Sequence, residues 1–137
     1  MRISKREFLA GSVMAGAGLA LAARRIGLRR NAEAGDEDRA DLAIYDGRTL
    51  AGRRFAARAR LAGVETVDMA ANGEAFWRRA RTGFGLADGA SIIGVTDWDA
   101  RVYLAAALAE RRMRVRREVR LARNAPDRDV LFAWRIA

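Results

Sequence analysis

Six residues expected at one edge of the protein have side chains that suit the binding of a small anion. Each follows a predicted strand, and they are Asp46, Arg48, Asn72, Thr96, Asp97 and Trp98. The carboxyl ends of parallel strands meet at one edge of an open sheet, and ligands of such folds bind there. Arg48 and the unpaired N–H groups of helix N-termini would attract an anion to this edge. Asp46 and Asp97 could exchange protons with it, which predicts at most weak acid–base catalysis.

The same residues also have a purely structural interpretation. Asp46 followed by Gly47 is typical of a turn, and Asn72 and Thr96 suit the caps of helices. Trp98 would then only cover the helix that it begins. The candidate ligand site therefore depends on the position of these residues in the fold and not on a specific motif.

Several kinds of chemistry are excluded because the chain of 137 residues contains neither cysteine nor histidine. It has no disulfide, no thiolate nucleophile, no zinc site built on these residues and no histidine base. No glycine-rich dinucleotide or phosphate-binding fingerprint follows a strand, and Ser91 stands at the start of a strand and not at a nucleophile elbow. We therefore predict no catalytic residue, no metal and no cofactor, and the sequence favours a non-enzymatic role.

The elements that position these residues follow from the apolar pattern, which predicts three strand–helix units and then a hairpin. Strands are expected at 42–45, 65–70, 91–95, 113–121 and 130–136, and helices at 50–62, 73–84 and 98–112. This order predicts a small three-layer α/β sandwich with the sheet order 2-1-3-5-4. The fourth strand alternates apolar and charged residues, so we expect it at the sheet edge, with an antiparallel fifth strand inside.

The third helix is expected to begin with a capping box formed by Thr96 and Asp99. Its predicted buried stripe contains Val102, Ala105, Ala106 and Ala109, with Leu104 and Leu108 beside it. Trp134 alternates with apolar residues in the last strand, which indicates a core position.

The first 22 residues have the pattern of a signal peptide, with a positive head, an apolar run and small residues at its end. The head resembles the twin-arginine (Tat) export motif through Ser4, Lys5, Arg6, Phe8 and Leu9, although Lys5 replaces the first arginine. We expect cleavage before Ala23 and a periplasmic protein exported through the Tat pathway. The alternative is an uncleaved segment that anchors the protein in the inner membrane.

Residues 23–40 combine a block of arginines with a block of acids and few apolar side chains, which predicts a flexible charged tether. Residues 41–137 then form a single α/β domain.

Arginine supplies 25 of the 26 basic residues, and the formal net charge is +9. This excess is typical of GC-rich coding, and without a recognised motif it does not favour nucleic acid as a partner. Arg114, Arg116 and Arg120 on the fourth strand either protect a sheet edge or bind an acidic partner or an anionic membrane. Trp77, beside three arginines, is either a core residue or a partner-binding residue.

Three segments carry a resemblance to known proteins: Phe76-Trp77-Arg78-Arg79, Ile92-Ile93-Gly94-Val95-Thr96 and Leu131-Phe132-Ala133-Trp134. Together they resemble small uncharacterised proteobacterial proteins that carry a Tat signal and a short α/β domain, with a Gly-Leu-Thr turn after the third strand. The resemblance implies export and this fold, and it transfers no catalytic residue.

Two classes of function fit these observations. The first is an exported, non-enzymatic accessory protein, either a small subunit or an escort of a larger exported enzyme that bears a cofactor. The alternative is a periplasmic domain that binds a small anionic ligand at the edge containing Asp46 and Thr96. A membrane-anchored protein is the third possibility.

Overall fold

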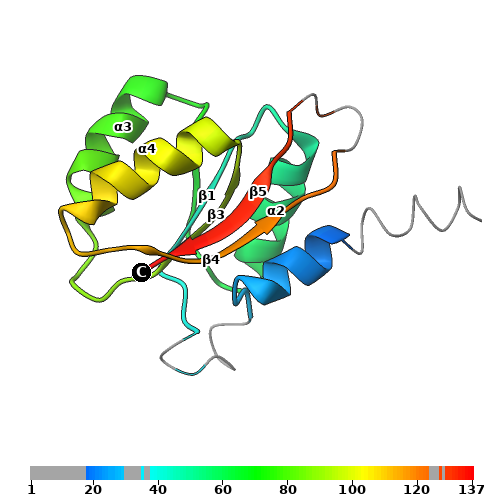
Figure 1. Cartoon of the computed structure of the whole chain (residues 1–137), viewed down its shortest axis with the longest axis horizontal. Helices are drawn as coiled ribbons and strands as arrows, with labels where there is room; N and C mark the ends of the chain where they lie inside the picture. The colour runs from blue at the N-terminus through cyan, green and yellow to red at the C-terminus, as the bar shows by residue number, and fades with distance from the viewer. Residues whose placement is uncertain (1–17, 30–34, 36–37, 124–126, 128) are drawn as a thin grey trace, which may run out of the picture.

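A single mixed sheet forms the centre of the protein in a computed structural model that describes residues 18–29, 35, 38–123, 127 and 129–137 (Figure 1). Its strands are β1 (Leu42–Tyr45), β2 (Thr66–Asp68), β3 (Ile92–Thr96), β4 (Val115–Arg120) and β5 (Phe132–Ile136). The spatial order is β2-β1-β3-β5-β4. β1 is parallel to β2 and β3, whereas β5 is antiparallel to β3 and β4. The predicted order, the inner fifth strand and the outer fourth strand are confirmed.

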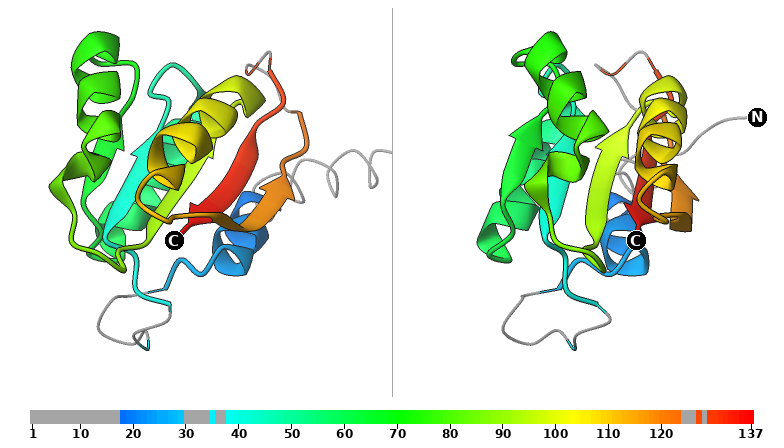
Figure 2. Two further views of the ribbon diagram at one scale, coloured as in Figure 1. Left: turned by 60° about the vertical axis from the view of Figure 1, so that its left-hand side comes forward. Right: turned by 90° about the vertical axis from the view of Figure 1, so that its left-hand side faces the viewer.

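Helices cover both faces of the sheet, which confirms the three-layer α/β sandwich (Figure 2). They are α2 (Leu50–Leu61), α3 (Gly73–Arg81) and α4 (Trp98–Ala109), together with helical residues 18–25 and the short 3-10 turn η1 (Gly83–Gly85). α3 and α4 lie on one face, and α2 lies with helical residues 18–25 on the other. Within the described part of the chain, no helix has the length and apolarity needed to cross a membrane.

The core beneath α3 and α4 is centred on Trp134, which is fully buried as predicted. Its indole Nε1 donates to the hydroxyl oxygen of Thr96 at 2.9 Å, which satisfies the one polar atom of the ring. Gly94 on β3 makes room for the ring, because a Cβ atom there would lie 2.3 Å from Trp134 Cζ2.

The core on the opposite face includes residues from the N-terminal part of the chain. Leu19, Ala22 and Ile26 pack with Phe55 of α2 and Ile93 of β3. Their spacing of three and four residues is that of one helix face, but the expected boundary after residue 22 divides this pattern between signal and tether.

Some apolar residues of the segment predicted as a tether (23–40) pack against the domain, and the boundaries of signal, tether and domain stay predictions. Ala23 and Ile26 are buried, and Leu28 packs against the same core. The blocks of charge predicted a solvated segment. The sequence contains too few apolar residues here to indicate that some of them would be buried. The export-motif residues Ser4, Lys5, Arg6, Phe8 and Leu9 lie outside the described residues, so signal recognition and cleavage stay predictions.

Two local expectations for α4 are wrong. Its N-cap is Asp97 and not Thr96, because the Asp97 carboxylate accepts a hydrogen bond from the Ala100 backbone N–H at 2.8 Å. The buried row consists of Ala100, Leu104 and Leu108, whereas Val102 is exposed. An alanine-rich helix offers two apolar rows, and the sheet buries the row that carries the leucines.

Candidate functional site

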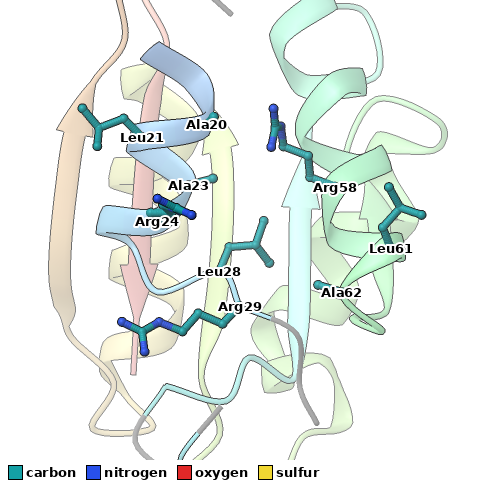
Figure 3. Close-up of a pocket in the computed structure, with 9 residues that line it drawn as sticks. All are labelled: Ala20, Leu21, Ala23, Arg24, Leu28, Arg29, Arg58, Leu61 and Ala62. Atoms are coloured by element: carbon teal, nitrogen blue, oxygen red, sulfur yellow. The ribbon is translucent and has the colours of Figure 1, made fainter. Parts of the chain in front are cut away.

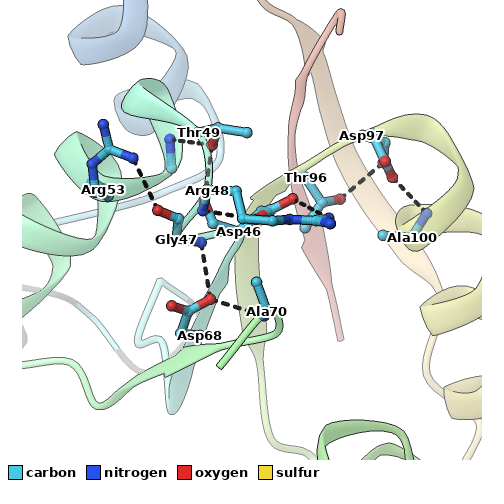
Figure 4. A network of polar contacts seen from close by, with 11 residues as sticks. Asp46, Gly47, Arg48, Thr49, Arg53, Asp68, Ala70, Thr96, Asp97 and Ala100 are labelled. Carbon is cyan, nitrogen blue, oxygen red and sulfur yellow. Dashed lines mark hydrogen bonds and ion pairs between the residues drawn. The ribbon is translucent and has the colours of Figure 1, made fainter. Parts of the chain in front are cut away.

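The carboxyl edge of the sheet is organised by an ion pair between Asp46 and Arg48 (Figure 4). Asp46 follows β1 and is buried, and Arg48 donates from Nε to Oδ1 at 3.0 Å and from a terminal nitrogen to Oδ2 at 2.9 Å. Burial alone would raise the pKa of Asp46, but the hydrogen bonds from the Arg48 side chain and backbone outweigh it and lower the pKa. The Arg48 guanidinium is therefore already neutralised by a carboxylate of its own loop.

A second carboxylate, that of Asp68 at the end of β2, holds the turn after β1 (Figure 4). Its Oδ1 atom accepts hydrogen bonds from the backbone N–H groups of Gly47 and Ala70, both at 2.9 Å. A Cβ atom on Gly47 would lie 2.0 Å from Asp68 Oδ2, so the close approach requires glycine at this position. Sequence reasoning missed Asp68, because an acid at the end of a short strand is no signal by itself.

A third carboxylate occupies the N-terminus of α2. Asp127 accepts hydrogen bonds from the backbone N–H groups of Leu50 at 2.7 Å and Ala51 at 3.0 Å. Thr49 caps the next donor, the N–H of Gly52, as predicted. A helix N-terminus attracts anions through its free N–H groups, and here the connection between β4 and β5 supplies that anion from within the chain.

The remaining candidate ligand residues also have internal partners. Asn72 caps α3 by accepting from the Ala75 N–H at 3.1 Å. Thr96 is fully buried, and its hydroxyl donates to the backbone oxygen of Asp97 at 3.0 Å. Trp98 remains 47% exposed and packs on Phe132, with their ring centroids 5.3 Å apart.

The structure thus brings Asp46, Arg48, Thr96 and Asp97 together at one edge, whereas Asn72 and Trp98 take part in other contacts. An external anion at this edge would compete with the carboxylates of Asp46, Asp68 and Asp127. The geometry therefore does not favour anion binding here, and that function stays a prediction.

A groove of about 520 Å³ lies beside this edge, between α3 and α4. Trp77 and Tyr103 line it with their rings nearly perpendicular and their centroids 6.1 Å apart. Trp77 also packs edge-on against Phe76, with a centroid separation of 5.0 Å. The two interpretations of Trp77 are therefore compatible, because one side of the ring supports the core and the indole still lines an open groove.

The outer face of α4 continues this groove as an apolar surface. Among the described residues, the large hydrophobic side chains left exposed on this helix are Trp98, Val102 and Tyr103, and Tyr103 is 65% exposed. A helix on the outside of a sandwich usually presents polar residues to water. The single arginine of α4, Arg101, lies over the Trp98 ring at 4.5 Å and forms an ion pair with Glu118 of β4 at 2.5 Å.

Of the arginines predicted on the fourth strand, Arg116 and Arg120 lie on the edge strand β4, and Arg114 directly precedes it. Arg114, Arg116 and Arg120 are all exposed, and Arg116 donates from Nε to the backbone oxygen of Ala137 at 3.1 Å. The pairing of β4 with β5 shifts register between Val115 and Arg117. Charged side chains and a register shift are both features that protect an edge strand from further pairing. Binding of a partner by these arginines stays a prediction.

Within the residues that the structure describes, no group of three acidic side chains is placed to hold a metal ion. No protein-family model, curated protein or solved structure matches the chain. The resemblance to small proteobacterial proteins with a Tat signal therefore stays a prediction.

Proposed function

We propose that the protein is an exported, non-enzymatic accessory protein that binds a larger exported enzyme through α4. The observation that carries this proposal is the exposed apolar surface of Trp98, Val102 and Tyr103. Exposed apolar side chains gathered on one element mark sites of protein interaction, whereas scattered ones need no explanation.

The chemistry of α4 indicates what kind of partner surface fits it. Its 12 residues include two charged side chains, Asp99 and Arg101, and Arg101 is already paired with Glu118. A second helix with an apolar stripe would cover Val102 and Tyr103, while Asp99 at the first turn would accept a hydrogen bond or a basic side chain. An amphipathic helix of the partner protein is therefore the expected occupant of this surface.

The groove between α3 and α4 supplies the anchor for this contact. Trp77 and Tyr103 form its aromatic lining, and Arg81 and Asp99 add charges of both signs. Aromatic residues in a pocket at the centre of an interface contribute much of the binding free energy. Charges of both signs suit a protein surface better than a simple anion, which would be repelled by Asp99.

The proposal is tested in the protein's own host with a photo-crosslinking residue in place of Tyr103. We expect one polypeptide to be captured in a stoichiometric complex, with the crosslink mapped to an apolar helix of that partner. The matched control carries the same residue in place of Leu61, which is more exposed than Tyr103 but lies on α2, and it should not capture this polypeptide.

The affinity for the captured partner is then compared between the native chain and a Val102→Ser, Tyr103→Ser variant. We expect at least a tenfold loss of binding with only a small fall in melting temperature, because both side chains are exposed and the Tyr103 ring loses only its contact with Trp77. A monodisperse monomer without a partner, or the same adduct from both crosslinking positions, would contradict the proposed function.

A further inference from the structure

A second groove lies on the opposite face of the sheet, between α2 and residues 20–29 (Figure 3). It has a volume of about 610 Å³. Leu28 contributes to its apolar lining, and Leu21 and Leu61 stand at its sides. Three arginines, Arg24, Arg29 and Arg58, surround the apolar part. The groove therefore combines apolar side chains with positive charge.

The two leucines are exposed instead of filling the groove. Leu61 has 83% of its surface exposed and Leu21 has 52%, although each belongs to a helix whose other face is buried in the core. A leucine that projects into water costs free energy, because its side chain prefers an apolar medium. The two leucines are thus available to contact an apolar surface outside the protein.

The two segments that form the groove carry charge of one sign. Neither residues 18–29 nor α2 contains an acid, and their arginines are Arg24, Arg25, Arg29, Arg53, Arg54, Arg58 and Arg60. In the described part of the chain, Arg24, Arg29 and Arg58 form no ion pair. On the other face, Glu74 and Asp99 offset part of the positive charge of α3 and α4.

We infer that this groove docks the protein onto the surface of an anionic phospholipid bilayer. Leu21 and Leu61 would enter the boundary between headgroups and acyl chains, and the three arginines would bind the lipid phosphates. Interfacial binding of this kind depends on apolar insertion together with attraction to anionic headgroups. A soluble anion would use the arginines but would leave both leucines in water.

The position of the groove along the chain supports the same occupant. The described structure begins at Gly18, next to the lining residues, and the preceding residues 8–17 carry no charge. An apolar stretch of sequence thus leads directly to the groove. This inference requires retention of residues 18–22, because cleavage before Ala23 would remove Leu21. It does not depend on the proposed partner surface of α4, which lies across the sheet.

The absence of cysteine allows a test with one labelled position in the full chain. Leu61→Cys is labelled with a nitrobenzoxadiazole fluorophore and mixed with vesicles of phosphatidylcholine and phosphatidylglycerol. We expect a several-fold rise in fluorescence, which reports transfer of the label from water to lipid. Vesicles of phosphatidylcholine alone should give a small change, and Tyr103→Cys on α4 is the matched control that should not respond.

The contribution of the arginines is measured by vesicle sedimentation of an Arg24→Gln, Arg58→Gln variant. Each arginine near an anionic surface contributes about 1 kcal/mol, or about fivefold in partitioning, so the variant should bind about 30-fold more weakly. The matched control, Arg78→Gln with Arg79→Gln on α3, removes the same charge from the other face and should bind nearly as well as the native chain.

Three outcomes would overturn the inference. They are equal losses in the two double variants, equal responses of the labels at positions 61 and 103, and a response of the position 61 label to inorganic phosphate alone. The first would indicate general charge attraction, the second non-specific adsorption, and the third a soluble anion as the ligand.

Discussion

Arg135 on β5 donates a hydrogen bond from Nε to the backbone oxygen of Ile26 at 2.6 Å, across 109 positions of sequence. Its guanidinium is buried, and its other acceptors are the backbone oxygens of Gly27, Asp38 and Arg39 and the hydroxyl of Ser91. Burial lowers the pKa of Arg135, yet an arginine stays protonated in a protein. One buried cation therefore joins the central sheet to the end of helical residues 18–25.

Replacing Arg135 by methionine should release this N-terminal segment. The variant leaves several buried backbone oxygens without a donor, and we expect the free energy of unfolding to fall by about 3 kcal/mol or more. Amide hydrogen exchange of residues 19–28 should rise more than that of β1 or β3. Arg120→Met, on the exposed edge strand, is the matched control and should change stability by about 0.5 kcal/mol at most. Uniform exchange throughout the variant would contradict the role of Arg135 as a local link.

Replacing Asp127 by alanine should uncap α2. The N–H groups of Leu50 and Ala51 lose their acceptor, and we expect a loss of about 1–2 kcal/mol in the free energy of unfolding. The vacated N-terminus should then attract a free anion, so sulfate should restore part of the lost stability in the variant but not in the native chain. Thermal unfolding with sulfate and with chloride at equal ionic strength measures this rescue. Equal salt effects on both proteins would show that Asp127 does not fill an anion position.

Replacing Arg48 by methionine should lower the free energy of unfolding by an amount that depends on pH. The pKa of Asp46 is lowered in the folded state, so its ionised form stabilises the protein above the unfolded pKa, which is about 3.9. We expect the stability difference between the native chain and the variant to be fully present at neutral pH. This stability difference should disappear as the pH falls through the pKa of Asp46 in the folded state. Arg48 is largely exposed, so water screens the pair and the difference should be modest. Urea unfolding across this pH range measures it, and a constant difference would exclude the ion pair as its cause.

Most of the fold could be predicted because its helix caps and strand patterns each depend on a few neighbouring residues, which can be recognised in the sequence. Thr49 and Asn72 cap the helices that they precede, and the alternating charges of β4 place it at the edge. The contacts of Asp127 and Arg135 were not predictable in this way. Each joins segments more than 70 positions apart, and nothing near either residue in the sequence indicates its partner.

The α4 surface shows a different limit of sequence reasoning. Val102 and Leu104 lie on opposite sides of a helix whose many alanines would allow either side to pack in a core. Only the sheet, which accommodates the larger leucines, decides which row is buried. The exposed residues of α4, on which the proposed function depends, can therefore be identified only when the packing of the helix on the sheet is known.

The buried N-terminal residues give a final prediction about signal cleavage. Removal of residues 1–22 would take away Leu19 and Ala22, which are buried in the core beside α2. We expect the free energy of unfolding of the chain that begins at Ala23 to be about 2–3 kcal/mol smaller than that of the full chain. The reason is that the apolar surface which Leu19 and Ala22 bury together with the core is lost from the folded state. Leu19→Ala in the full chain should reproduce about 2 kcal/mol of that loss. Leu21→Ala, two positions away on the exposed side, should change stability by about 0.5 kcal/mol at most. Equal stability of the full and shortened chains in urea unfolding would mean that residues 18–22 do not contribute to the core. The expected difference would mean that the protein is most stable when this segment is retained.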